Sequence, residues 1–133
     1  MIPNNNDGLQ VAFEFAELPT HTFRLHALRD IVAGFTNQTQ AMVQAIYLIL
    51  NVPRYEHLIY SWNYGVEFSD LIGQQIAFCV PEIKRRITEA LTQDSRILAV
   101  DNFIFDTGRG TVHAMFTAHT IFGDIDAERT VEV

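Results

Sequence analysis

The sequence lacks several features that define common classes of protein. Its 133 residues include a single cysteine, Cys79, so no disulfide can form within the chain and we expect a free thiol in a reducing cytoplasm. Nine Lys and Arg stand against sixteen Asp and Glu, which argues against a nucleic-acid partner because phosphate contacts need concentrated basic surface. The longest wholly apolar run, residues 45–50, is far shorter than the ~20 residues that span a membrane. The first residues also lack the basic and apolar segments of a signal peptide.

Apolar residues are abundant, at 48% of the chain, and ten of them are Phe. This composition predicts one domain over residues 1–133 with its own hydrophobic core. Residues 1–8 are expected to be flexible, because three consecutive Asn and an Asp-Gly pair disfavour regular structure. The mean hydropathy of +0.08 favours some apolar surface that a partner covers.

Periodicity predicts an α+β fold in which two main helices pack on a mixed, largely antiparallel sheet. One helix is expected from Asn37, as N-cap, to Pro53. A second is expected from about residue 80, with Pro81 in its first turn. A single helical turn is predicted over residues 69–73. Alternating or apolar segments predict strands over residues 9–15, 22–25, 31–35 and 57–60.

The C-terminal third predicts a meander of three antiparallel strands. The first, residues 97–105, is apolar on both faces and is therefore expected to be central. Residues 106–110 form a hairpin loop that leads into a strand over 112–118. The last strand, residues 125–133, alternates between an apolar face and an acidic one, which carries Asp126, Glu128 and Glu132.

The residues that would support metal or nucleophilic chemistry are poorly placed for it. His113 and His119 share a strand face but lie ~20 Å apart, too far to hold one ion. Cys79 stands between Phe78 and Val80, as a small core residue would. We therefore expect no metal, no cofactor, no catalytic residue and no small-molecule substrate.

Two other functions stay open on the residues alone. A cell-wall glycosidase would need two carboxylates, which Glu67, Asp70 or Glu56 could supply beside the apolar side chains of Trp62 and Tyr64. The ordinary interpretation of Glu67 and Asp70 is that they are acids at a helix N-terminus. A regulatory binding module that reuses the fold is the third possibility.

Two segments carry the residue types that anchor protein interfaces. Residues 54–68 combine Arg54 with five aromatic side chains, including Trp62 and Tyr64. Asp94-Ser95-Arg96 places an acid and a base together where the second helix leaves and the meander begins.

These segments resemble the small baseplate wedge proteins of contractile phage tails and tail-like bacteriocins, a family that includes the so-called tail lysozymes. The similarity is closest to the branch found in defective prophages of Gram-positive bacteria, and it extends from about Thr22 to the C-terminus. Asp94-Ser95-Arg96 stands where the family carries Glu-Pro-Arg, and Arg54 matches the arginine of its Gly-Glu-Arg. The stretches that carry the resemblance are RYEHLIYSWNYG (54–65), DLIG (70–73), KRRI (84–87), DSRI (94–97) and residues 116–123.

The resemblance implies a structural protein and not an enzyme. Such a protein links the baseplate wedge to the sheath and templates sheath assembly, in a virion or tail particle assembled in the bacterial cytoplasm. Its implied partners are the larger wedge proteins and the sheath subunit, which would add a strand to an open sheet edge. We expect Asp94 and Arg96, and then Arg54, Trp62 and Tyr64, to contact the wedge. The acidic face of the last strand would suit a basic partner.

Overall fold

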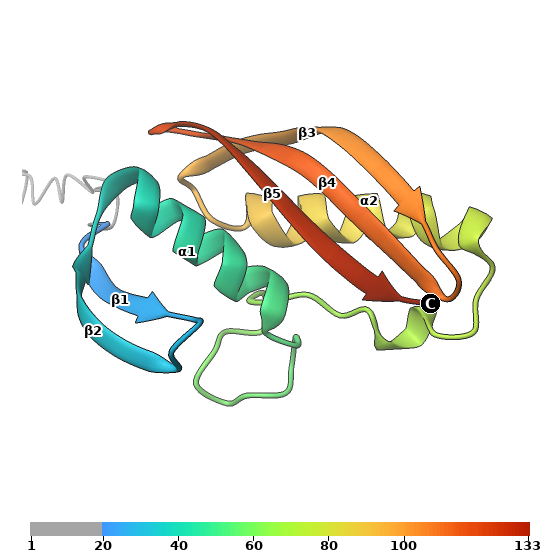
Figure 1. The fold of residues 1–133 in the computed structure, drawn as a ribbon, viewed down its shortest axis with the longest axis horizontal. Helices are drawn as coiled ribbons and strands as arrows, with labels where there is room; N and C mark the ends of the chain where they lie inside the picture. The colour runs from blue at the N-terminus through green and yellow to red at the C-terminus, as the bar shows by residue number, and fades with distance from the viewer. Residues whose placement is uncertain (1–19) are drawn as a thin grey trace, which may run out of the picture.

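The computed structural model describes residues 20–133, so the expected flexible start and the predicted strand over residues 9–15 lie outside the described part. Residues 20–133 form five strands, two long helices and one short 3₁₀ turn, arranged as in Figure 1. In chain order they are β1 (Thr22–His26), β2 (Ile31–Thr36), α1 (Gln38–Asn51), η1 (Ser69–Leu71), α2 (Ile76–Thr92), β3 (Ile97–Thr107), β4 (Thr111–Thr120) and β5 (Gly123–Glu132).

The strands form two separate sheets. β1 pairs with β2, and β3, β4 and β5 form the C-terminal meander in the order β3-β4-β5; every strand pair is antiparallel. The predicted α+β class, with two helices and a terminal three-strand meander, is confirmed.

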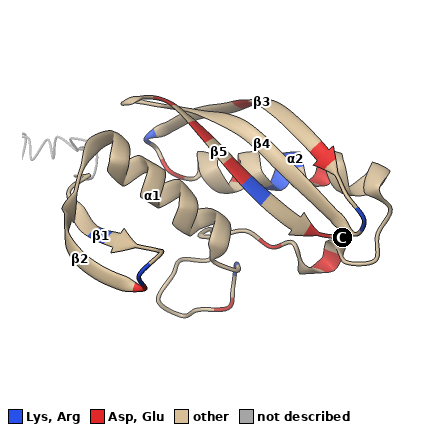
Figure 2. Cartoon of the chain, viewed as in Figure 1, with Lys and Arg blue, Asp and Glu red and all other residues tan. Residues whose placement is uncertain are grey.

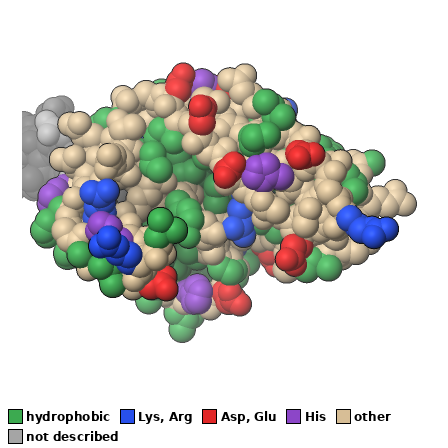
Figure 3. Space-filling view, viewed as in Figure 1, with side chains coloured by type: hydrophobic (Ala, Val, Ile, Leu, Met, Phe, Trp, Pro, Cys, Tyr) green, Lys and Arg blue, Asp and Glu red, His purple; other side chains and the backbone are tan. Residues whose placement is uncertain are grey.

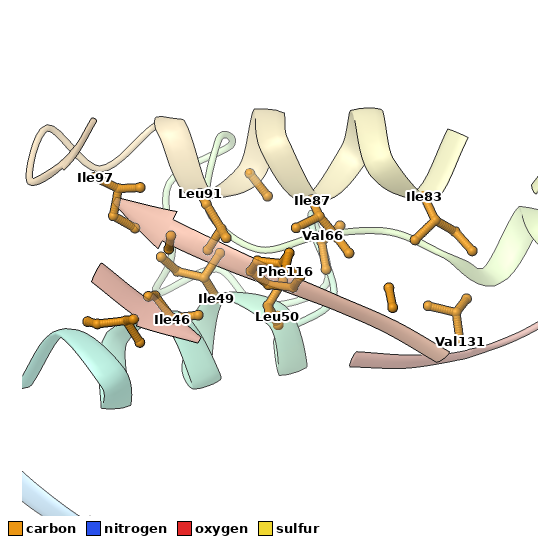
Figure 4. Packing of buried hydrophobic residues seen from close by; sticks show 14 of the residues in the cluster. Ile46, Ile49, Leu50, Val66, Ile83, Ile87, Leu91, Ile97, Phe116 and Val131 are labelled. Carbon is orange, nitrogen blue, oxygen red and sulfur yellow. The ribbon is translucent and has the colours of Figure 1, made fainter. Parts of the chain in front are cut away.

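Both helices pack on one face of the three-stranded sheet, and the core lies between the helices and this sheet (Figure 4). The predicted core face of α2, Ile83, Ile87 and Leu91, is fully buried. Burial of each such side chain stabilises the fold by roughly 1.5–3 kcal/mol. Cys79 is buried as expected, with its Sγ 3.8 Å from the Leu71 carbonyl oxygen. Opposite α2 lie Met42, Ile46, Ile49 and Leu50 of α1, with Val112, Phe116, Ile125 and Val131 of the sheet.

The expectation that the first meander strand is central was wrong, because β4 lies between β3 and β5. β3 is an edge strand, and its Leu98 and Ile104 are exposed. Its register with β4 shifts between Asp101 and Ile104, where Asn102 adopts a φ of 54°. Consecutive residues of any strand point to opposite faces, so the continuous apolar run of this edge strand does not mean burial on both faces.

The boundaries of the helices show two further differences. α2 begins at Ile76, not near residue 80, so Pro81 lies inside it. Proline removes the bond to the carbonyl of Ala77, and both residues are on the exposed side, where water can replace that bond. α1 begins as predicted after Asn37, but the Asn37 side chain makes no capping bond; Gln38 N donates instead to Thr20 Oγ1 at 3.0 Å.

Candidate functional site

The acid and base predicted at the exit of α2 bind each other. Asp94 Oδ1 accepts hydrogen bonds from the backbone N and Nε of Arg96 at 3.0 and 2.9 Å, and Oδ2 accepts from Nη2 at 2.6 Å. The two side chains are only 16% and 18% exposed. Burial raises the pKa of the Asp94 carboxyl, but the hydrogen bonds from Arg96 outweigh it and hold that pKa below its ordinary value. The pair is therefore a rigid, ionised surface feature.

This pair lines a cavity of about 390 Å³ between the end of α1, the end of α2 and the loop that joins them. Tyr64 lines the same cavity, together with Ser61 and Asn63 of the loop. The Tyr64 ring stacks on Tyr60 with their centroids 4.5 Å apart. Burial, followed by the charges of Tyr60 and Asp94, raises the pKa of the Tyr64 hydroxyl, which stays a neutral donor. Tyr64, Asp94 and Arg96 thus form one site, named here the helix-exit pocket.

The two other residues predicted for this surface lie outside the helix-exit pocket. Trp62 is 79% exposed on the loop, with its ring 5.7 Å from that of Tyr55. Arg54 is held against α2, where its Nη1 lies 3.1 Å from Glu89 Oε1 and its Nε donates to the Gly65 carbonyl oxygen at 3.2 Å. The structure therefore brings together three of the five residues and gives Arg54 a role in holding the loop.

The loop between α1 and η1 is closed at its base by backbone contacts. Val66 N donates to the Val52 carbonyl oxygen at 3.1 Å, which forms a parallel bridge beside Pro53. The predicted strand over residues 57–60 was wrong, because these residues form turns with Leu58 and Ile59 fully exposed. A strand needs a neighbour to bond its backbone, and among the described strands none lies beside this segment. The predicted single turn over residues 69–73 is confirmed by η1.

Of the three carboxylates considered for glycoside hydrolysis, Asp70 is held in an ion pair with Arg86, and Glu67 and Glu56 are exposed. Asp70 Oδ2 accepts from Arg86 Nη2 at 2.7 Å, and this bond lowers the pKa of the Asp70 carboxyl. Glu82 accepts from Arg85 and then Arg86, which lowers its pKa to about 2. Glu56 lies exposed in the loop. A general acid needs a raised pKa, and the bond from Arg86 favours the ionised form of Asp70 instead.

Acidic residues recur along β5 (Figure 2), and those of its acidic face are exposed. Asp126 Oδ1 accepts from Thr117 Oγ1 at 2.8 Å, and Glu128 Oε2 lies 3.2 Å from His113 Nε2. Glu132 pairs with Thr111 at the other end of the strand. The predicted alternation of apolar and acidic residues is confirmed, and β5 is an edge strand as a partner-binding strand would be.

Sequence reasoning missed two positions that organise the structure. Arg86 links α2 to η1, because it bonds Asp70 and the Glu67 carbonyl oxygen as well as Glu82. The Glu82-Arg86 spacing of four residues indicated only the contact within the helix. Gln44 of α1 bonds the backbone of β1, which no periodicity marks.

Within residues 20–133 no helix is both long and apolar enough to cross a membrane. In the same part of the chain, no group of three or more His, Cys, Asp or Glu side chains is arranged to hold a metal ion.

Within residues 20–133 each sheet ends in strands that pair on one side only, and such edges can bind another protein by strand addition. Comparison with known proteins identifies the family to which the chain belongs. Residues 22–123 match the family described as contractile injection system sheath initiator, and the chain belongs to this family. It is also 34% identical over 95 residues to the phage-like element PBSX protein XkdS of Bacillus subtilis (strain 168), which covers 69% of this chain and 67% of that protein.

Family membership confirms the expected function. The protein is a structural, non-enzymatic sheath initiator of a contractile injection system, and it templates sheath assembly at the baseplate as a component of a phage-like tail particle. Its partners are sheath and baseplate components. The residues that contact each partner, and the finer assignment to a wedge position, remain predictions.

Proposed function

We propose that the sheath subunit adds a strand to the outer edge of β2, and that a wedge protein of the baseplate binds the helix-exit pocket. The observation that carries the first contact is that the β1-β2 sheet has only two strands within residues 20–133. Two strands form a marginal sheet on their own, and a third strand with an apolar face is normally needed for stability.

The two edges of this sheet differ. Gln44 takes the place of a neighbour beside β1: its Oε1 accepts from Leu25 N at 2.9 Å and its Nε2 donates to the Phe23 carbonyl oxygen at 2.8 Å. β2 pairs only with β1 among the described strands, and its residues 31–35 are all exposed. β2 is therefore the edge that can accept a strand.

The side chains of β2 also favour an added strand. Val32 and Phe35 are 62% and 60% exposed, and Phe35 stacks on Phe23 with centroids 5.1 Å apart. An apolar side chain on an added strand would bury part of this surface, at about 25 cal/mol for each Å² removed from water. Strand addition then supplies both the backbone bonds and the apolar contact.

The helix-exit pocket lies at the ends of α1 and α2 and includes no residue of β2. Its lining contains a negative charge on Asp94, a positive charge on Arg96 and a neutral hydrogen-bond donor, the Tyr64 hydroxyl. This combination supports binding of a polar segment of a wedge protein, flanked by the exposed Trp62.

The experiment is electron microscopy of tails from cells that carry Val32→Lys with Phe35→Lys. Lysine on an edge strand opposes strand pairing, and both side chains are exposed enough for the domain to fold. We expect baseplates without attached sheaths. Ile72→Lys is the matched control, since Ile72 is 61% exposed and lies after η1. Normal sheaths in the double variant would overturn the assignment to β2.

A further inference from the structure

His119 lies at one end of the three-stranded sheet and contacts both neighbouring strands. Its Nδ1 lies 2.6 Å from Asp124 Oδ1 of β5, and its Nε2 lies 2.7 Å from Asp101 Oδ1 of β3. Since His119 belongs to the central strand β4, one side chain joins all three strands, which lie side by side in Figure 1.

The two contacts together require a protonated ring. A neutral imidazole carries one N–H donor, and an ionised carboxylate only accepts. With a neutral ring, one of the two short contacts would place a nitrogen lone pair against a carboxylate oxygen. The imidazolium donates from both nitrogens, so the observed geometry is that of the charged form.

The other charged groups on this face also favour the proton. Asp126 and Glu128 of β5 and Asp106 of β3 are further acids, and acidic and histidine side chains lie side by side over the sheet (Figure 3). His113 is the second histidine of β4. The basic side chain within the three strands, Arg129, reaches the opposite face, where Nη1 donates to Asn51 of α1.

We propose that protonated His119 is a bridge that ties both edge strands to β4, and that loss of its proton frees one edge strand at this end of the sheet. The hydrogen bonds that His119 donates to Asp124 and then Asp101 raise the pKa of His119 above its ordinary value of 6.5. A raised pKa gives stabilisation that is complete below pH 6.5 and is lost as the pH rises through the pKa of the folded state. The bridge is independent of the contacts proposed with sheath and wedge.

The first test is NMR titration of the His119 ring nitrogens in the wild-type chain. We expect both nitrogens to be protonated at pH 6 and the pKa to exceed 6.5. Asp101→Asn and Asp124→Asn should each lower that pKa, because each removes one acceptor. A His119 pKa at or below 6.5 in the wild-type chain would overturn the proposal.

The second test is amide hydrogen exchange, corrected for the intrinsic effect of pH. We expect protection near the bridge, at Asp101 opposite Thr117 and at Ile125 opposite Ala118, to fall about tenfold for each unit by which the pKa is raised, as the pH passes that pKa. Protection at Val112, near the other end of β4, should not change. His119→Gln should abolish this dependence on pH, whereas His113→Gln, which removes contacts to β5 alone, should leave it. The same dependence in His119→Gln would contradict the bridge.

Discussion

Gly65 approaches the backbone of Val52 so closely that a Cβ at position 65 would overlap the Val52 carbonyl oxygen. That oxygen accepts the bond from Val66 N that closes the loop between α1 and η1. The same glycine has a φ of +88°, which L-residues rarely adopt. The loop base therefore depends on glycine for two separate reasons.

These reasons can be measured separately by comparing two glycines. Gly73 has a φ of +85°, but within the described chain nothing lies within 4 Å of an added Cβ. Gly73→Ala should lower the free energy of unfolding by about 1–2 kcal/mol, the penalty for the left-handed conformation. Gly65→Ala should lower the free energy of unfolding by the same amount and by about a further 1–3 kcal/mol, because of the overlap with the Val52 carbonyl oxygen. Urea denaturation measures both variants, and equal losses would contradict the contact with Val52.

The ion pairs around Arg86 predict a loss of stability in acid. The pKa of Glu82 is lowered to about 2 and that of Asp70 is also lowered, so both contribute stability above the ordinary carboxyl pKa and lose it as the pH falls through the folded values. We expect the free energy of unfolding to fall between pH 5 and about pH 2. Arg86→Gln should reduce this slope.

Arg109→Gln is the matched control for the acid effect. Arg109 is exposed in the turn between β3 and β4, away from Arg86. Arg109→Gln removes the same charge as Arg86→Gln and should leave the slope of the free energy of unfolding against pH unchanged. If both variants show the wild-type slope in denaturant titrations from pH 7 to pH 2.5, the ion pairs of α2 do not control acid stability.

The sequence was sufficient where periodicity and local signals agree with the packing. The core face of α2 at Ile83, Ile87 and Leu91 and the alternation along β5 were both predictable, because each element buries one face. The resemblance pointed to the helix exit, and the structure brings Tyr64 to Asp94 and Arg96 there. No local signal indicates that a loop residue closes this pocket.

The failures have physical causes that a single sequence hides. The edge position of β3 was missed because its consecutive apolar residues face both sides of the strand, as those of a central strand would. The bridge at His119 depends on Asp101 and Asp124, which come together only through the pairing of three strands. Contacts between distant strands depend on register, which no local pattern specifies.

The Asp94-Arg96 pair predicts that the double substitution lowers the free energy of unfolding less than Arg96→Ala alone. Arg96→Ala leaves a half-buried carboxylate without the bonds that the Arg96 side chain supplies, and should lower the free energy of unfolding by about 1–3 kcal/mol. Adding Asp94→Ala should recover part of this loss, since the unpaired charge is then removed. Thermal denaturation of both variants tests the coupling, and additive losses would contradict it.

The same double variant tests the proposed contact with the wedge. We expect folded protein that no longer joins the baseplate, seen by electron microscopy as tails with missing or detached sheaths. Arg109→Ala, which removes an exposed charge in the turn between β3 and β4 and leaves the helix-exit pocket in place, should have no effect on assembly. Normal contractile tails from the double variant would remove the pair from the mechanism.

The acidic face of β5 predicts an electrostatic contact with a basic partner. Asp126, Glu128 and Glu132 are all exposed, so replacing them with Lys should leave the core intact. Reversed charge would repel a basic sheath surface, and sheath attachment should weaken in tails viewed by electron microscopy. The neutral variant, with Asn and Gln at the same positions, should be intermediate, because it removes attraction without adding repulsion. Raising the salt concentration should weaken wild-type attachment and spare the neutral variant, since salt screens exposed charges. Unchanged assembly in the Lys variant would show that this face contacts no charged partner and that β5 is acidic only to prevent self-pairing.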